Sequence, residues 1–330
     1  MSAAYPKIEL HVHLEGSVSP AALLEAAARN ECELPFDTEA ALAEFMAFRD
    51  FDHFIEAWFA TTTVLRTERD YRELVVAYAR RAQAHGAVYL EGIFSPTDKL
   101  PLGVDLDTVF TGFCDGAQQA REELGIEVLL TPDITRGVEP EVAEATAECA
   151  TRYRERGVVA LGLGGAEALY PPEPYARAFE IARAGGLASV PHAGEVAGPD
   201  SIRGALDALG ADRIRHGVRA VEDPELLAEL AERQIVCDIC VLSNVCLSVV
   251  PSVATHPLPQ MLAAGVLCTV NTDDPTFFGC ELDAEHEAAL SLGADPQALF
   301  EAGIAGALCG DETRSELRAI AAATAWPIRV

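Results

Sequence analysis

The chain has 330 residues, of which 50% are hydrophobic, and its 24 basic and 52 acidic side chains give a formal net charge of −28. So large an apolar fraction excludes a disordered chain, which lacks the apolar surface to build a core. The acidic excess argues against nucleic acid or an anionic membrane as a partner, because both are bound by clustered lysine and arginine.

The sequence shows no sign of a membrane protein or a secreted protein. No apolar run reaches the ~18 residues that a transmembrane helix needs. Residues Met1 to Glu9 lack the charged start and apolar centre of a signal peptide. The nine cysteines lie mostly in apolar runs, which is typical of buried free thiols in a reducing compartment. We therefore expect a soluble cytoplasmic protein.

Short apolar, β-branched segments alternate along the chain with longer segments rich in alanine, leucine and glutamate. The predicted strands are Ile8–His13, Val88–Phe94, Glu127–Thr131, Val158–Leu163, Ala188–His192, Arg213–His216, Ile235–Cys240 and Leu267–Asn271. Between most of them the pattern predicts helices, such as Thr108–Leu124, Pro140–Arg156, Pro174–Ala184 and Pro224–Arg233. Several of these helices begin with proline, which suits the first helical position.

Strand followed by helix, repeated eight times, indicates a parallel sheet, and eight strands close a (β/α)8 (TIM) barrel. We therefore expect one α/β domain over residues 1–330. An open doubly wound sheet is the alternative. Against it, no G-x-G-x-x-G sequence follows an early strand, and Gly162-Leu163-Gly164-Gly165 is only a weak echo of one.

The longest interval between predicted strands runs from Leu14 to Ala87, and we expect residues 14–87 to form extra helices over the active-site end of the barrel. Phe54 and Trp58 in this insertion are four residues apart, so they share one face of a helix. Helix packing and contact with a substrate are equally open interpretations of this pair.

Polar residues gather where the predicted strands end. His11 and His13 are two apart on the first strand, so both imidazoles point to the same side. His192 and His216 end the fifth and sixth strands, and two aspartates at 273–274 follow the eighth. The carboxyl ends of all strands meet at the face of a barrel where active sites are built, so we expect these side chains to converge.

Three imidazoles and a carboxylate suit a zinc ion, and we expect His11, His13, His192 and Asp273 to hold one Zn²⁺ per chain. A catalytic zinc lowers the pKa of water from 15.7 to about 7, which provides hydroxide for a hydrolysis at neutral pH. Glu195 follows His192 by three residues and is the candidate general acid/base. The alternative for Glu195 is a solvated loop carboxylate.

Other metal chemistries fit the sequence less well. A two-metal site commonly uses a carboxylated lysine at the end of the fourth strand, but Lys7 and Lys99 are the only lysines and lie elsewhere. Cys237 and Cys240 have no second cysteine pair, and residues three apart on a strand face opposite sides, which favours a structural role. The cytidine-deaminase signature, H-x-E with P-C-x-x-C, is absent.

The remaining histidines carry weaker signals. A lone histidine is more often a satisfied core residue than a ligand, so we expect structural roles for His53, His85 and His286. His256 precedes Pro257 in a predicted loop, and its role stays open.

Five segments contain most of these polar residues in a fixed order. They are Pro6-Lys7-Ile8-Glu9-Leu10-His11-Val12-His13-Leu14-Glu15-Gly16, His192-Ala193-Gly194-Glu195, Arg213-Ile214-Arg215-His216-Gly217, Ser243-Asn244 and Asn271-Thr272-Asp273-Asp274-Pro275. Together they resemble the motifs of the adenosine deaminases, a family of the amidohydrolase superfamily. The resemblance spans Pro6 to about Leu282 and implies a zinc-bearing barrel that replaces the 6-amino group of a purine with oxygen.

The resemblance also implies a role for each site residue. Glu195 would give a proton to N1 of the purine, and His216 would orient and deprotonate the attacking water. Asp273 would serve as both zinc ligand and catalytic residue. Asp274 would hydrogen-bond N7, and the backbone N–H of Gly165 would meet N3.

Two departures from the family pattern concern the substrate. Members that act on adenosine usually carry aspartate where this chain has Glu15, which we count with Phe54 and Trp58 among the expected substrate contacts. A glutamate at this position resembles the adenine deaminases and the aminodeoxyfutalosine deaminases. The segment from His216 to Ala220 resembles the adenine deaminases. Gly165, in contrast, is the glycine of the nucleoside enzymes, so the exact substrate stays open.

Two further departures have no assigned role. Val241 replaces the proline of a Cys-Pro-x-Ser-Asn motif, and Arg215 replaces a usual glycine or aspartate. As the neighbour of His216 on a strand, Arg215 is expected to point away from the barrel interior and to form a surface salt bridge.

The sequence thus predicts zinc-dependent hydrolytic deamination of a 6-aminopurine nucleoside, either adenosine or a similar compound such as aminodeoxyfutalosine. An adenine deaminase is the alternative. An ester or lactone hydrolase with the same metal, and a non-catalytic binding protein on the same barrel, are further alternatives. The expected partner is a small 6-aminopurine, without nucleic acid or membrane, and the sequence does not give the oligomeric state.

Overall fold

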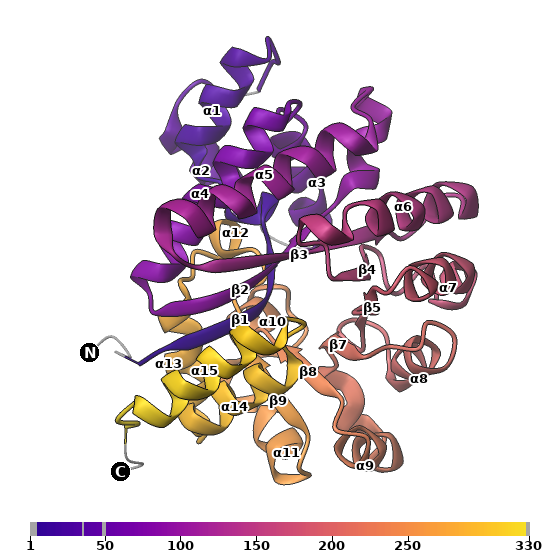
Figure 1. The fold of residues 1–330 in the computed structure, drawn as a ribbon, viewed down its shortest axis with the longest axis vertical. Coiled ribbons are helices and arrows are strands. Elements are labelled where there is room, and N and C mark those ends of the chain that lie inside the picture. Colours follow the sequence, from indigo (N-terminus) through magenta and orange to yellow (C-terminus); the bar gives the residue numbers. More distant parts are fainter. Residues whose placement is uncertain (1–4, 35, 48–50, 328–330) are drawn as a thin grey trace.

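The computed structural model describes residues 5–34, 36–47 and 51–327, in which strands and helices alternate as the sequence predicts (Figure 1). The strands are β1 (Lys7–His13), β2 (Ala87–Phe94), β3 (Glu127–Thr135), β4 (Ala160–Gly164), β5 (Ala188–Ser189), β6 (His192–Ala193), β7 (Arg213–His216), β8 (Val236–Ile239) and β9 (Leu267–Val270). The helices are α1 (Pro20–Arg29), α2 (Glu39–Met46), α3 (Phe51–Thr62), α4 (Glu68–Ala84), α5 (Leu106–Leu124), α6 (Pro140–Arg152), α7 (Ala176–Ala184), α8 (Pro199–Asp207), α9 (Pro224–Glu232), α10 (Val241–Cys246), α11 (Leu258–Ala263), α12 (Pro275–Phe278), α13 (Leu282–Ser291), α14 (Pro296–Gly306) and α15 (Asp311–Ala323).

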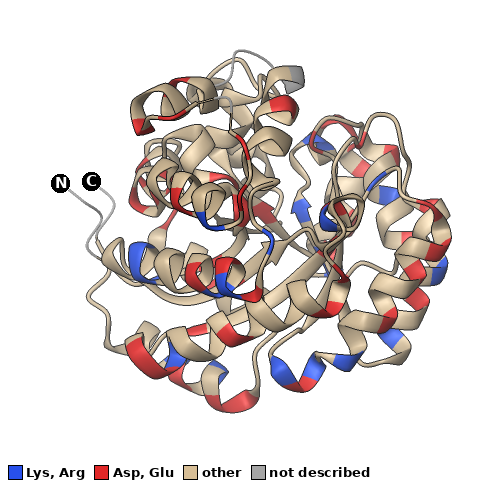
Figure 2. Ribbon diagram, turned by 90° about the horizontal axis from the view of Figure 1, so that it is seen from above, with Lys and Arg blue, Asp and Glu red and all other residues tan. Residues whose placement is uncertain are grey.

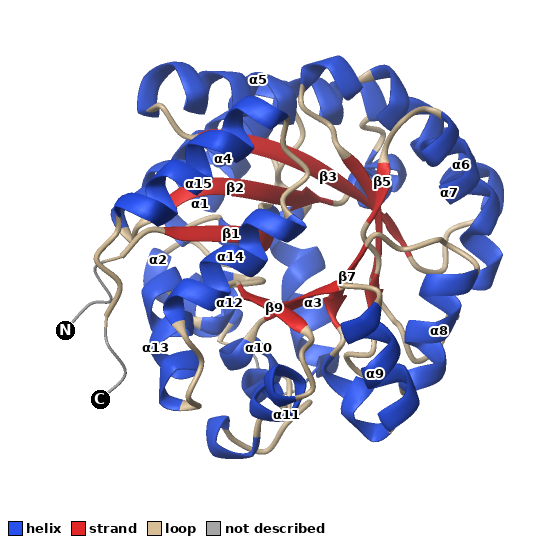
Figure 3. Cartoon of the chain, turned by 60° about the horizontal axis from the view of Figure 1, so that its bottom comes forward, coloured by secondary structure: helices blue, strands red, loops and turns tan. Residues whose placement is uncertain are grey.

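The strands pair in parallel and in chain order, β1 to β5 in one run and β6 to β9 in another. β5 and β6 are two halves of the predicted fifth strand: Val190 donates a backbone hydrogen bond to β4, and Pro191 accepts one from β7. The circuit closes where Val12 of β1 bridges Asp273 beyond β9. Figure 3 shows the strands inside a ring of helices, which confirms the predicted (β/α)8 barrel.

Local sequence explains where the long helices begin and end. The side chain of Thr67 accepts from the backbone N–H of Asp70, and Asp70 reaches back to Thr67, which forms a capping box at the start of α4. The Asp105 side chain accepts from Thr108 at the start of α5, and Gly125 ends that helix in a left-handed conformation.

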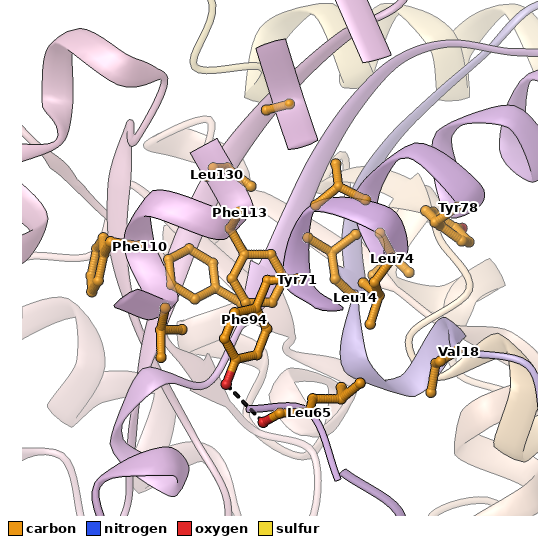
Figure 4. Close-up of a cluster of buried hydrophobic side chains, with 14 of the residues drawn as sticks. Leu14, Val18, Leu65, Tyr71, Leu74, Tyr78, Phe94, Phe110, Phe113 and Leu130 are labelled. Carbon is orange, nitrogen blue, oxygen red and sulfur yellow. Dashed lines mark hydrogen bonds between the residues drawn. The ribbon is translucent and has the colours of Figure 1, made fainter. Parts of the chain in front are cut away.

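An apolar layer joins the outer helices to the strands (Figure 4). Phe94 of β2 stacks on Phe113 of α5 with ring centroids 4.4 Å apart, and Tyr71 of α4 stacks on Phe113 at 5.0 Å. The hydroxyl of Tyr71 donates to the backbone carbonyl of Leu65, so this buried polar group is satisfied. Burial of side chains this large stabilises the fold by roughly 1.5–3 kcal/mol each.

The barrel interior is charged instead of apolar. Arg213 of β7 is 1% exposed and donates to Glu91 of β2 and to Asp238 of β8, both at 2.7 Å. Burial raises the pKa of Asp238 to about 6, although the Arg213 charge opposes this shift. Its guanidinium also donates to the backbone carbonyl of Gly306, so one side chain crosses the barrel and joins β7, β2, β8 and α14. The side chains that usually fill a barrel of this type are branched and apolar.

The expectation that Arg215 lies on the surface is wrong. Arg215 is fully buried, forms an ion pair with Asp133 of β3 and donates to Thr131 at 2.7 Å. Alternation along β7 places Arg213 and Arg215 on the same inward side. His216 joins them there because its φ of +62° turns the chain at the end of the strand.

The interval after β1 contains α1 to α4, and Figure 1 shows these helices together at one end of the molecule. Acidic residues predominate over the outer helices, with basic residues scattered among them (Figure 2). In the described part of the chain, no helix is both long and apolar enough to span a membrane.

We predict that Arg213→Met destabilises the fold by about 3–5 kcal/mol, because it leaves the carboxylates of Glu91 and Asp238 buried without a counter-charge. Urea unfolding followed by circular dichroism measures the change. The matched control is Arg69→Met, since Arg69 is exposed and pairs only with Glu73 on the surface of α4. Equal unfolding midpoints for the two variants would contradict the prediction.

Candidate active site

Four side chains at the carboxyl end of the barrel form a closed ring of contacts. The Nε2 atom of His192 lies 3.2 Å from the Nε2 atoms of both His11 and His13. Oδ1 of Asp273 lies 3.1 Å from Nε2 of His11 and 3.4 Å from Nε2 of His13. The four side chains that the sequence analysis selected as zinc ligands are thus brought together, and His11, His192 and Asp273 are buried.

The contacts of His192 determine which of its nitrogens faces the ring. Nδ1 of His192 lies 3.0 Å from the backbone carbonyl of Leu163 and 3.3 Å from Oδ2 of Asp133, and both of these oxygens only accept. Nδ1 therefore carries a proton, and Nε2 is the nitrogen that points into the ring.

The donor set suits a metal ion, and neighbouring members of the ring are spaced like ligands of one ion. Metal–nitrogen distances of 2.0–2.1 Å for zinc place neighbouring ligand atoms about 3.3 Å apart, and the four contacts around the ring are 3.1–3.4 Å long. His216 lies close to the ring, with its candidate ligand atom within 4.8 Å of those of His11, His192 and Asp273. The chain therefore offers three imidazoles and a carboxylate, with a fourth imidazole adjacent.

Backbone contacts hold Asp273 in this position. Its N–H donates to the carbonyl of His11, its carbonyl accepts from the N–H of His13, and its φ is +63°. The strained backbone thus places the carboxylate between the two imidazoles of β1. Burial lowers the pKa of His11 well below its usual range and that of His13 to about 4, so both imidazoles are neutral at pH 7, as ligation of a metal requires.

Glu195 lies beside the ring on a loop that a second carboxylate organises. Burial raises the pKa of Glu195 well above its usual range, and the charges of Asp273 and Glu167 raise it further, which favours the protonated form. Glu167 accepts backbone hydrogen bonds from Gly194 at 2.6 Å, Glu195 at 3.2 Å and Val196 at 2.9 Å. This carboxylate fixes the backbone that carries Glu195.

Asp274 packs against the turn after β1. A Cβ atom at Gly16 would lie 1.9 Å from Oδ1 of Asp274, so only glycine allows this approach. Burial raises the pKa of Asp274 well above its usual range, with smaller contributions from the charges of Asp273 and Glu195. Burial thus favours the protonated form of Asp274 as well, which can donate a hydrogen bond.

A cavity of about 240 Å³ opens onto these groups. Its lining includes Phe54 and Trp58 from α3 and Gly165 after β4, as the sequence analysis expected, together with Glu195, His216 and Asp274. The volume is below the roughly 300–1,000 Å³ of pockets for drug-sized ligands, so a small ligand fits it.

Glu15, the remaining predicted substrate contact, does not line this cavity. It is fully buried, its Oε1 accepts from the backbone N–H of Ser95 at 3.0 Å, and its Oε2 has no hydrogen-bond partner in the described structure. Burial raises its pKa, and the Lys99 charge opposes the shift. A direct contact between Glu15 and a substrate stays a prediction.

Sequence reasoning missed three residues that shape the site: Asp133, Arg136 and Glu167. Asp133 was missed because the predicted strand ends at Thr131, whereas β3 continues four residues further, to Thr135. Arg136 follows this strand, and its guanidinium donates to the carbonyl of His192 at 2.7 Å. Glu167 lies three residues after β4, so its place at the carboxyl end of a strand is the signal that could have identified it.

Comparison with known proteins agrees with this geometry. The family model described as adenosine deaminase matches residues 6–320. An aminodeoxyfutalosine deaminase from Acidothermus cellulolyticus is 47% identical over 98% of this chain and 93% of its own. An adenine deaminase from Streptomyces coelicolor is 42% identical over 83% of this chain and 80% of its own.

Solved structures give the same result. An adenine deaminase from Arthrobacter aurescens has a TM-score of 0.91 and 32% identity over 97% of this chain and 98% of its own. An amidohydrolase from Burkholderia ambifaria, solved with bound zinc, has a TM-score of 0.88 and 28% identity over 97% of this chain and 90% of its own. The family model, the relatives and the barrel with its converging histidines lead to one conclusion: the chain belongs to the adenosine deaminase family, whose members hydrolytically deaminate 6-aminopurine compounds.

Proposed function

We propose that this chain deaminates a 6-aminopurine nucleoside at a site built from one zinc ion and the acids Glu195 and Asp274. The observation that carries the proposal is the ring of His11, His13, His192 and Asp273 beside a protonated Glu195 in a small cavity. In the reaction, the oxygen of water forms a bond to C6 and the C6–N bond breaks. One proton of the water completes the departing ammonia, and the other passes to solvent, from which Glu195 regains the proton that it gives to N1.

Zinc is the metal that we assign to the ring. Its support is the close spacing of three imidazoles and a carboxylate, and the zinc found in the related amidohydrolase. When bound, zinc acts as a Lewis acid that lets water react as hydroxide near pH 7.

The chain's own residues recognise the purine through hydrogen-bond donors. The protonated Glu195 gives its proton to N1, which makes C6 more electrophilic, and the neutral Asp274 donates to N7. The backbone N–H of Gly165, which lines the cavity, meets N3. Each positioned proton transfer accelerates such a reaction by roughly 10²–10⁴-fold.

His216 orients the attacking water in this proposal. Its Nε2 atom lies 3.6 Å from Oε1 of Glu195 and 3.9 Å from Oδ2 of Asp273, between the acid and the ring. Phe54 and Trp58 form the apolar wall of the cavity, where they exclude water from the substrate.

Among 6-aminopurines we favour a nucleoside, with aminodeoxyfutalosine first, because the relative that shares 47% identity over nearly the whole chain is named for that activity. Adenine is the second candidate, supported by the adenine deaminases at 42% sequence identity and at a TM-score of 0.91. A cytoplasmic location is part of the proposal.

The substrate is tested by incubating the zinc-loaded protein with adenosine, adenine and aminodeoxyfutalosine in parallel. We expect the highest kcat/KM with aminodeoxyfutalosine, measured as ammonia release and as the change in purine absorbance. Fastest turnover of adenine would instead establish the second candidate. Turnover of none of the three, together with cleavage of an ester or lactone, would refute the proposed function.

Glu195→Gln is expected to lower kcat by roughly 10²–10⁴-fold, because the amide cannot transfer a proton to N1. Zinc content, measured by elemental analysis, should stay at about one per chain because Glu195 lies outside the ring. Glu225→Gln is the matched control, since Glu225 is exposed at the start of α9. Near-normal ammonia release by Glu195→Gln would remove this residue from the mechanism.

Chelation of the metal is expected to abolish ammonia release, and added zinc should restore it. His192→Ala should lose most of its zinc. Asp133→Asn should bind zinc 10–100-fold more weakly, because Asp133 contacts the Nδ1 atom of His192. The control for Asp133 is Asp207→Asn at the exposed end of α8. Full activity in metal-free protein would contradict the assignment of the ring as a metal site.

A further inference from the structure

A chain of three hydrogen bonds runs behind His216, on the side away from the cavity. The backbone N–H of Leu258 donates to Nδ1 of His256 at 3.0 Å. Nε2 of His256 lies 3.2 Å from Oδ1 of Asn244, and Nδ2 of Asn244 lies 3.3 Å from Nδ1 of His216. The three side chains are buried, so water does not compete for these partners.

The direction of every bond in this chain follows from its first member. A backbone N–H can only donate, so Nδ1 of His256 is unprotonated and the proton of this imidazole sits on Nε2. That N–H must donate to Asn244, which fixes the amide with its oxygen toward His256. The amide nitrogen of Asn244 then faces His216 and donates to Nδ1, so Nδ1 of His216 carries no proton. Burial lowers the pKa of His256 to about 4, consistent with a neutral ring.

We infer that His256 is a positioning residue that acts through Asn244 to hold His216 in its Nε2–H tautomer. His216 then presents a hydrogen-bond donor, and not a base, toward Glu195 and Asp273. The inference rests on the proposed place of His216 beside the attacking water, and it changes the role expected from the sequence. An Nε2–H group orients the water oxygen and stabilises the negative charge that develops on it, without accepting its proton.

The same short helix serves both the ring and His216. Ser243, next to Asn244 on α10, donates from Oγ to Oδ2 of Asp273 at 2.6 Å. Glu285 accepts from the backbone N–H of Leu242 at 3.0 Å and thereby fixes the start of this helix. Two adjacent side chains of α10 thus orient one zinc-ring residue and one residue at the reacting centre.

The test of this inference is Asn244→Asp, which keeps the shape of the side chain but replaces the donor with an acceptor. His216 must then protonate Nδ1 to satisfy the carboxylate, and its Nε2 atom no longer presents a neutral N–H group. A wrong histidine tautomer has cost about 10⁴-fold in kcat in a serine protease. We expect a loss of at least about 10²-fold in kcat here, with KM nearly unchanged.

Nitrogen-15 NMR of selectively labelled histidines reports the tautomer directly, with no need for turnover. In the zinc-loaded wild-type protein, the His216 signals should show a proton on Nε2 and none on Nδ1, and in Asn244→Asp they should show a proton on Nδ1. The spectrum of His216→Asn assigns the signals by their absence. Because this measurement needs no substrate, it separates a failure of the inference from a failure of the proposed function.

His256→Phe provides the second arm, because it removes the Nε2–H group that donates to the Asn244 amide oxygen. We expect mixed His216 tautomers and a fall in kcat, smaller than in Asn244→Asp. His85→Gln, in a half-buried histidine remote from the cavity, is the control. A proton on Nδ1 of His216 in the wild type would overturn the inference. A wild-type kcat in Asn244→Asp, measured on protein in which Nδ1 of His216 is protonated, would also overturn the inference.

Discussion

Two arginines inside the barrel constrain much of the rest of the structure. Arg213 and Arg215 extend from β7 across the interior and end on carboxylates of β2, β8 and β3. A buried charge of this kind is tolerated only when a partner of opposite sign and further hydrogen bonds surround it. The choice of side chains on the strands that face these two arginines is therefore restricted. At Gly162 of β4, a Cβ atom would lie 2.0 Å from Oδ1 of Asp133 and 2.4 Å from Nη1 of Arg215.

The charged interior of the barrel is connected to the active site through Asp133. Asp133 is bound by Arg215 on one oxygen and lies 3.3 Å from Nδ1 of His192 on the other. Through that imidazole, the ion pair orients a lone pair in the ring above it. The ring is closed from the other side by Asp273, whose backbone is held by both neighbours of Val12. The apolar side chains that usually fill a barrel are thus replaced here by polar contacts, and each contact fixes the position of the next side chain.

The sequence predicted those features that depend on local pattern. Alternating segments located every strand to within a few residues, and the ends of the strands located the ring residues and Glu195. The missed features depend on contacts across the barrel. Arg215 was assigned to the surface because strict alternation was applied through His216, whose left-handed backbone breaks it. In the sequence, Glu167 resembles any acidic loop residue. Only the fold shows that its carboxylate accepts hydrogen bonds from the backbone between Gly194 and Ala197. His256 has no signal in its own segment, because its partner Asn244 lies on another element.

The hydrogen-bond polarity of the cavity accounts for the kind of ring that it would accept. Burial favours the protonated forms of Glu195 and Asp274, which line the cavity as donors, and Gly165 adds a backbone N–H. Adenine presents three ring nitrogens that only accept, N1, N3 and N7, and thus matches this set in number and in sign. In the proposed reaction, Glu195 becomes an acceptor that faces an N–H group after its proton has moved to N1, which is the pairing that the 6-oxopurine product requires. The same carboxyl group would therefore pair with N1 as a donor before the reaction and as an acceptor after it, because the proton that it loses is the one that N1 gains.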